Sequence, residues 1–320
     1  MKRMIVAALL CLGLAGGASR AWADTWPDRP IAIVVPFAAG GPTDVTARLI
    51  SEQMGRSLGQ SVVVENRPGG TTMIAAEYVA RSRPDGNVLL IAAGTTLTTN
   101  PHLFRHLPYK VSDFAPVGLV TRLPFVILVR KGLPWTIPEF VTYARAHPGT
   151  LNYGTTGRGS MSHIVGAMVG EGLGIDWSDV PYRGVAPGTT EVIAGRLDVN
   201  VDAANTAVEA HRSGQAGILG WTGPERMPIT PEIPTFAETT PGLVIETWFG
   251  LVAPAQTPPE RIARLNAALN DALAPRALQD RLIAMGQIAA PGTPAEFATF
   301  LDRQSERYGA VIRKLDLHLD

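Results

Sequence analysis

The sequence predicts an α/β protein built as two lobes, each a mostly parallel sheet flanked by helices. Two observations predict this class. Short runs rich in β-branched residues alternate with segments of helical periodicity along most of the chain, an order typical of parallel sheets covered by helices. The succession of strand, glycine turn and helix at residues 31–49 also recurs at residues 151–163, which indicates a second unit of similar design.

The first residues have the pattern of a secretory signal peptide. Lys2 and Arg3 precede an apolar stretch, and the small residues around Trp22 form a cleavage site. The apolar stretch is shorter than the ~18 residues that a membrane span requires. We therefore expect residues 1–23 to be removed after Ala23 and the remaining chain to be exported.

Composition excludes several classes of function. Cys11 is the only cysteine and lies inside the predicted signal, so disulfides and cysteine-zinc sites are not expected. Without Lys2, Arg3 and Arg20, the 28 basic side chains fall to 25, against 28 acidic ones. This slightly acidic balance, without basic tracts, argues against nucleic acid or an anionic membrane as the partner.

The first half predicts one sheet with its helices. Apolar runs predict strands at residues 31–36, 61–65, 88–93 and 117–120. Apolar residues at helical spacing predict one helix through Val45, Leu49 and Met54 and another through Ile74, Tyr78 and Val79.

The second half predicts another sheet and a helical end. Strands are expected at residues 125–129, 151–153, 179–181, 197–201, 217–221 and 245–252. Helices are expected at 137–146, 259–273, 276–285 and 294–315; one further helix begins at Ser160, and another, after the strand at 179–181, ends at Gly195. Prolines 124, 254, 258 and 259 mark the expected crossings between the lobes. We expect the first lobe at residues 24–123 plus 225–320 and the second lobe at 124–224.

The first glycine turn predicts an anion site. Gly40 and Gly41 connect a strand to a helix whose N-terminus carries partial positive charge and unpaired N–H groups. Neither a nucleotide P-loop nor a G-x-G-x-x-G pattern is present, so a small carboxylate is the expected ligand. The turn could equally be structural, with Pro42 opening the helix and Asp44 paired to Arg48 one turn later.

The segment YGTTGRGSMSH, residues 153–163, repeats this arrangement with Ser160 as the expected N-cap. Because ligands of open α/β sheets lie beyond the carboxyl ends of the strands, two such lobes would enclose one ligand cleft. Further loops on the same rims follow other strands at residues 65–70, 94–96 and 180–184. Four or five hydrogen bonds of ~1.5–3 kcal/mol each could supply the ~8 kcal/mol of micromolar binding after the costs of association.

Catalytic interpretations have weaker support. Ser160 and His163 could form a nucleophile and its base in a secreted hydrolase, but no G-x-S-x-G motif surrounds them. His102 and His106 lack the H-E-x-x-H context of a metal site, and we expect no metal and no cofactor. Tyr182 and Arg183 could contact ligand or lie along the surface, and Asp202 could accept a ligand hydroxyl or amine or be an ordinary paired carboxylate.

Several segments, in order, carry a family resemblance: WPDRPIAIVVPFAAGGPTDVTAR, VVVENRPGG, TTNPHLFRHLPYKVSDFAPV, LNYGTTGRGSMSH, VPYRG, ETWFGLVAPAQTP and TPAEFATFL. Together they resemble the TctC-like extracytoplasmic receptors, or Bug family, of tripartite tricarboxylate transporters. The resemblance covers about residues 26–315.

The resemblance implies a periplasmic binding protein of the type II class that closes on a small carboxylate and passes it to a membrane permease. We expect it to act as a monomer; a ligand-dependent sensor subunit without a transport role is an alternative. Combining the family's loops with the rim residues gives this expected ligand set: Ala38, Ala39, Gly40, Gly41, Thr43, Asn66, Thr95, Thr96, Thr155, Thr156, Arg158, Ser160, Ser162, His163, Tyr182, Arg183 and Asp202.

Three positions depart from the family pattern. Pro42 replaces a glycine often found in the first turn, which removes an N–H donor. Gly70-Thr71-Thr72-Met73 replaces a glycine-rich stretch and an asparagine, and Arg158 occupies a loop where small or uncharged residues are usual. These positions bear on specificity, although the sequence does not name the acid.

Overall fold

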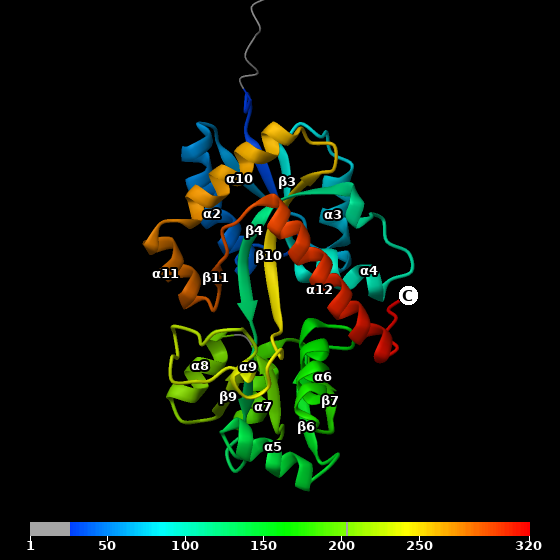
Figure 1. Cartoon of the computed structure of the whole chain (residues 1–320), viewed down its shortest axis with the longest axis vertical. Helices are drawn as coiled ribbons and strands as arrows, with labels where there is room; N and C mark the ends of the chain where they lie inside the picture. The colour runs from blue at the N-terminus through cyan, green and yellow to red at the C-terminus, as the bar shows by residue number, and fades with distance from the viewer. Residues whose placement is uncertain (1–25, 203) are drawn as a thin grey trace, which may run out of the picture.

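The computed structural model describes residues 26–202 and 204–320. They form two lobes, one above the other in Figure 1. The long strands β4 (Phe114–Pro124) and β10 (Glu246–Pro254) run toward the junction between them. The predicted signal peptide and its cleavage after Ala23 lie outside the described residues. Within the described part, no helix has the length and apolar character needed to cross a membrane.

The first lobe is a six-stranded sheet of order β11-β4-β10-β3-β1-β2. Its strands are β1 (Ile31–Val35), β2 (Val62–Asn66), β3 (Val88–Ala93), β4 (Phe114–Pro124), β10 (Glu246–Pro254) and β11 (Ile288–Ala289). One face is covered by α2 (Pro42–Leu58), α10 (Pro259–Leu273) and α11 (Arg276–Ala284), the other by α3 (Met73–Ala80) and α12 (Pro294–Lys314). Short turns complete the lobe: η1 (Gly70–Thr72), η2 (Thr95–Thr99), α4 (Asn100–Leu103) and η3 (Val111–Asp113).

The second lobe is a five-stranded sheet of order β7-β6-β8-β5-β9. Its strands are β5 (Val126–Val129), β6 (Leu151–Thr155), β7 (Trp177–Pro181), β8 (Val199–Asp202) and β9 (Gly217–Trp221). Apolar side chains of α5 (Ile137–Ala146), α6 (Met161–Leu173) and α9 (Phe236–Thr239) cover one face, and those of α7 (Val185–Ile193) and α8 (Ala204–Arg212) cover the other. Each sheet is thus enclosed by two layers of helices, as the alternating sequence pattern predicts.

The expectation of mostly parallel sheets needs correction, because both sheets are mixed. In the first lobe β1 pairs in parallel with β2 and β3, whereas β10 runs antiparallel to β3 and β4. In the second lobe β6 pairs in parallel with β7 and β8, whereas β5 is antiparallel to β8 and β9. Two of the reversed strands, β5 and β10, are those by which the chain enters a lobe from its neighbour, so they start at the opposite end from the strands of the β-α-β units. The two-residue β11 is also antiparallel, to β4.

The chain returns to the first lobe later than the expected position, residue 225. Met227 and Ile233 pack with the core that α7 and α8 cover, and Phe236 and Ile245 pack with the core on the other face. The N–H of Trp221 also donates to the carbonyl of Pro234 at 3.0 Å. Residues 225–245 therefore lie with the second lobe, and the return occurs where β10 begins.

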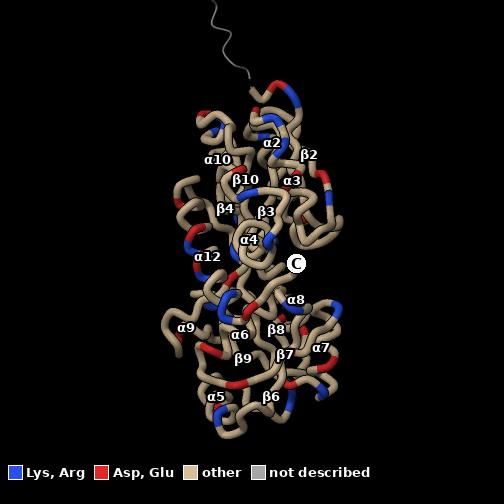
Figure 2. Tube along the Cα trace, turned by 90° about the vertical axis from the view of Figure 1, so that its right-hand side faces the viewer, with Lys and Arg blue, Asp and Glu red and all other residues tan. Residues whose placement is uncertain are grey.

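The C-terminal helix also joins the lobes. Phe297 and Phe300 at its start pack on the first sheet, whereas Tyr308 and Ile312 near its end belong to a core cluster of the second lobe. The C-terminus lies at the level of the junction between the lobes in both views (Figures 1 and 2). Figure 2 also shows basic and acidic residues interspersed over both lobes.

Candidate functional site

The first-lobe turn follows β1 and opens α2, as the sequence predicts. Gly40 has φ +84° and Gly41 is the extended N-cap, with Pro42 in the first helical position. The Gly40 N–H donates to the carboxylate of Asp44 at 2.9 Å, and the same carboxylate oxygen accepts from Arg48 Nε at 3.0 Å. The Asp44–Arg48 pair of the structural interpretation is therefore present, and it occupies the Gly40 amide.

Asn66 ties this turn to the end of β2. Its Nδ2 donates to the Phe37 carbonyl at 3.1 Å and to Asp44 Oδ1 at 2.9 Å. Arg48, the Gly40 N–H and Asn66 together hold the pKa of the Asp44 carboxyl at about 2, although burial opposes the shift. Asn66 therefore positions the turn through its amide, and a buried negative charge lies directly beneath the predicted anion site.

The remaining residues of the turn differ in exposure. Ala38, Ala39 and Gly40 are exposed, whereas Thr43 is buried. Within residues 26–202 and 204–320, the amides of Ala38, Ala39 and Gly41 donate no hydrogen bond. These donors, and not that of Gly40, can serve an anion at this end of α2.

The threonine loop after β3 is folded inward. Thr96 is fully buried, its hydroxyl accepts from the Ala93 N–H at 3.3 Å, and its carbonyl accepts from the Tyr109 hydroxyl at 2.5 Å. Thr95 is half-buried, and its carbonyl accepts from the Thr99 hydroxyl at 3.3 Å. Thr96 thus supports the loop, and Thr95 is the member of the pair nearer to solvent.

In the second lobe, Ser162 organises the turn after β6. Its buried hydroxyl accepts the Thr156 N–H at 2.8 Å and lies 3.1 Å from the hydroxyls of both Thr156 and Ser160. Ser160 is the N-cap of α6, and its Oγ accepts the His163 N–H at 3.3 Å. The buried Thr155 hydroxyl accepts from the Gly157 N–H at 3.2 Å.

His163 is also buried within this turn. Its Nδ1 accepts the Gly159 N–H at 3.1 Å, and its Nε2 faces the Asp179 carboxylate at 3.9 Å. Burial lowers the pKa of His163, Asp179 opposes this and Arg158 adds to it. The ring is therefore neutral with its proton on Nε2, and it does not receive the hydroxyl proton of Ser160, so the geometry lacks the Ser-His pair of the hydrolase alternative.

Four predicted contacts lie further along the rim or beneath it. Arg158 is exposed and its guanidinium donates to the Asp316 carbonyl at 3.3 Å. Tyr182 is half-buried and adjoins the turn, since its N–H donates to the Thr155 carbonyl at 2.8 Å, and Arg183 is exposed. Asp202 is fully buried and accepts from Thr206 Oγ1 at 2.6 Å, from Asn200 Nδ2 at 3.1 Å and from the Thr189 hydroxyl.

The predicted residues thus lie in two groups, one on each lobe, and hydrogen bonds link only part of each: Asn66 and Gly40 meet at Asp44 in the first lobe, and Thr156, Ser160, Ser162 and His163 are linked in the second. Among the described residues, no recorded hydrogen bond joins the two groups directly. The structure also shows a contact that sequence reasoning missed: the side chains of Thr46, in the second turn of α2, and Gln287, after α11, meet at 3.0 Å. They are 241 residues apart in sequence, and no local pattern indicates that pairing.

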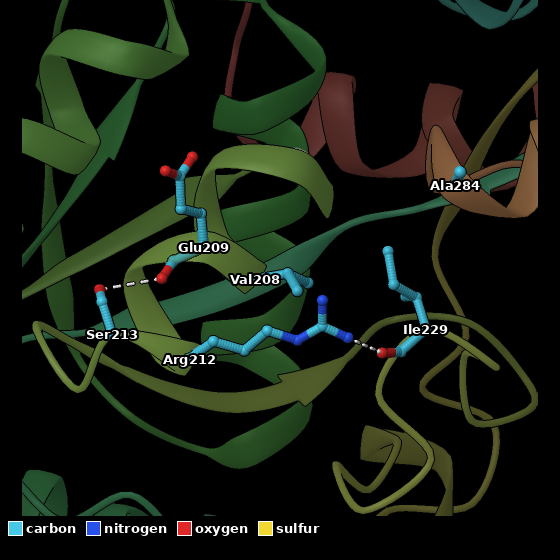
Figure 3. Close-up of a pocket in the computed structure, with 6 residues that line it drawn as sticks. All are labelled: Val208, Glu209, Arg212, Ser213, Ile229 and Ala284. Atoms are coloured by element: carbon cyan, nitrogen blue, oxygen red, sulfur yellow. Dashed lines mark hydrogen bonds between the residues drawn. The ribbon is translucent and has the colours of Figure 1, made fainter.

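An open cavity of about 520 Å³ lies between α8 of the second lobe and α11 of the first (Figure 3). Val208, Glu209 and Arg212 of α8 line it from the second lobe, with Ile229, and Ala284 of α11 lines it from the first. The Arg212 side chain points across to the Ile229 carbonyl and donates to it at 2.7 Å. In the described part of the chain, no cluster of three His, Cys, Asp or Glu side chains is arranged to hold a metal ion.

Comparison with known proteins identifies the family. The family model described as "Tripartite tricarboxylate transporter family receptor", TctC, matches residues 46–317. The chain belongs to the TctC family. This match confirms the resemblance. TctC proteins are solute-binding receptors of the periplasm and not enzymes.

Solved structures agree with this assignment. The periplasmic binding protein BugD superposes with a TM-score of 0.72 at 31% identity, over 92% of this chain and 100% of that one. An R. palustris protein solved with adipate gives a TM-score of 0.76 at 31% identity, with the same coverage. MatC from Rhodopseudomonas palustris, solved with bound malate, gives 0.71 at 34% identity over 90% and 100% of the two chains. These likenesses confirm the α/β two-lobed class of type II binding proteins.

Proposed function

We propose that this TctC-family protein is exported by cleavage after Ala23, captures a small organic carboxylate between its two lobes as a monomer, and delivers it to a membrane permease. The observation that carries the proposal is the pair of turns at the carboxyl ends of β1 and β6, each of which opens a long helix. Relatives solved with adipate and malate support a carboxylate as the ligand.

In this proposal one carboxylate of the ligand accepts hydrogen bonds from Gly41 and its neighbours at the N-terminus of α2. The ligand-binding set is the one that the sequence predicts, with Gly40 and Asn66 acting by shaping the turn. A partly buried helix end contributes up to ~2 kcal/mol to anion binding. Neutral hydroxyls and amides supply the other contacts, so release to a partner requires no chemical step.

The direct test is calorimetry on residues 24–320 against mono- and dicarboxylates that include adipate and malate. We expect at least one acid to bind with a Kd in the micromolar range, and binding of none would overturn the proposal. Ser160→Ala is expected to weaken binding only partly. Thr293→Ala is the matched control, because Thr293 is the N-cap of α12 and its side chain accepts the Glu296 N–H in the same way; it should lower stability to a similar extent and leave the affinity unchanged.

A further inference from the structure

The segment that follows α12 folds back sharply and has a defined course. Asp316 has a left-handed φ of +48°. The N–H of Leu317 then donates to the Ile312 carbonyl at 3.1 Å, which is the bond of a helix end that reverses at a left-handed residue. The Leu317 side chain is buried in the core of the second lobe. Residues 316–320, which we call the strap, are therefore anchored where they leave the helix.

The other end of the strap is bonded to the first lobe. Both carboxylate oxygens of Asp320 accept the Arg105 N–H at 2.9 Å, and one of them accepts the His106 N–H at 3.0 Å. The Leu319 N–H donates to the Leu103 carbonyl at 3.0 Å. Leu103 ends α4, and α4 follows directly on η2, the threonine loop of the candidate site. One short helix thus separates the strap from that loop.

Between these two anchors the strap packs on the second-lobe turn. A Cβ added at Gly159 would lie 3.2 Å from Leu319 Cδ1 and 3.4 Å from Leu103 Cδ2, so both leucine side chains contact the turn. Gly159 is buried, and its N–H donates to Nδ1 of His163 at 3.1 Å. The strap therefore contacts the residue that orients the His163 ring.

We propose that the strap is a positioning element for ligand binding. Leu319 and Asp320 fix the second-lobe turn relative to the threonine loop of the first lobe, so that both halves of the site are ordered before the acid arrives. The inference rests on the proposed function, in which both loops contact the ligand. A loop that is ordered in advance loses less conformational entropy on binding, so the strap raises affinity without touching the ligand.

The number of contacts sets the expected size of the effect. The Leu319 side chain is 40% exposed, and Ser162 bonds the turn from within. Loss of the strap should therefore loosen the turn without unfolding the lobe. Removing one ordinary hydrogen bond changes an equilibrium constant by about 3- to 10-fold. The apparent Kd rises by the same factor when only the ordered turn binds the acid.

The test compares the wild type with the double variant Leu319→Ser, Asp320→Ala, both as residues 24–320. Calorimetry with adipate, malate, succinate and benzoate as probes measures Kd, and hydrogen exchange without ligand measures the protection of amides 156–163. The double variant should raise Kd by about 3- to 10-fold, mainly through a less favourable entropy of binding, and should speed exchange in residues 156–163 but not in residues 38–41. Asp320→Asn, which keeps one acceptor oxygen, should lose less affinity.

Asp113→Ala is the matched control. The Asp113 carboxylate also accepts a backbone N–H, that of Lys110 at 2.8 Å, but it lies just before β4, at the end of that strand remote from the junction (Figure 1). This variant should leave the Kd and the exchange of residues 156–163 unchanged, and thermal unfolding reports whether each variant is folded.

A wild-type Kd in the double variant, or unchanged protection of residues 156–163, would overturn the role of the strap while the receptor function stands. Failure of the wild type to bind any acid would overturn the proposed function itself. The exchange measured without ligand would then still decide whether the strap orders the turn.

Discussion

Asp44 is expected to stabilise the first-lobe turn at the expense of anion affinity. Its side chain is 4% exposed and accepts from Gly40, Arg48 and Asn66. Lowering its pKa from 3.8 to about 2 corresponds to about 2 kcal/mol of folding free energy at ~1.36 kcal/mol per pKa unit. Because the Arg48 side chain is 53% exposed, solvent screening reduces the effect, and we expect Asp44→Asn to destabilise the protein by about 1–2 kcal/mol at neutral pH.

The pH dependence gives the sharper measurement. A carboxyl whose pKa is lowered by folding contributes its stability above its unfolded pKa and loses it as pH falls through the folded value. The free energy of unfolding, measured by urea titration, should therefore decline in the wild type between about pH 4 and pH 2. The Asp44→Asn protein should show a smaller decline by about the amount that it loses at pH 7. Glu238, whose pKa is also held at about 2, contributes equally in both proteins and cancels in the difference.

The matched control is Glu52→Gln in the same helix. Glu52 pairs with Arg56 at 2.6 Å, but both side chains are more than 60% exposed, so we expect a loss of no more than about 0.5 kcal/mol. Removing the Asp44 charge should also tighten binding of a carboxylate at the turn, most clearly at low salt. An Asp44→Asn protein as stable as Glu52→Gln, or with the full wild-type decline in acid, would refute this account of the turn.

Three further predictions concern the core of the second lobe and the contact between the lobes. Gly286→Ala should weaken ligand binding and lower the melting temperature, because the new Cβ would overlap Ala204 and because the φ of residue 286 is +73°. Ligand titration measures the first effect and thermal unfolding the second. Unchanged affinity would show that the contact with Ala204 is not part of the closed state. Ser162→Ala should destabilise the protein by about 0.5–1.5 kcal/mol, since it removes the hydrogen-bond acceptor of the Thr156 N–H. Urea unfolding tests this, and wild-type stability would contradict it. Tyr308→Phe should cost about 1–2 kcal/mol in the same assay, because the buried hydroxyl donates to the Glu246 carbonyl, and wild-type stability would refute the contribution of that bond.

Elements with strong local patterns are predicted from the sequence almost to the residue. The strand at residues 88–93 and the helices at 137–146 and 259–273 match β3, α5 and α10. Hydrophobic period and proline at the first helical turn suffice to locate these elements. The antiparallel placement of β5 and β10 is not predicted, since it depends on which lobe the chain enters these strands from.

The candidate site also has features that the sequence predicts and features that it does not. The two glycine turns and the N-cap at Ser160 follow from residues adjacent in sequence. The partners that decide which groups remain available are distant: Asn66 reaches Asp44 over 22 residues and Gln287 reaches Thr46 over 241. The left-handed backbone of Thr71 and Thr72, with φ of 49° and 75°, is equally invisible in a pattern, because β-branched residues normally avoid that region.

Arg158 illustrates why distant contacts alter the functional interpretation. By charge alone, Arg158 and Arg183 are equivalent candidates for a second negative group of the ligand. In the folded chain, however, the guanidinium of Arg158 donates to the carbonyl of Asp316, and Gly159 packs against Leu103 and Leu319. The C-terminal segment thus holds the second-lobe turn in place and engages its cation, so the Arg183 side chain is the better candidate to recognise a second charge.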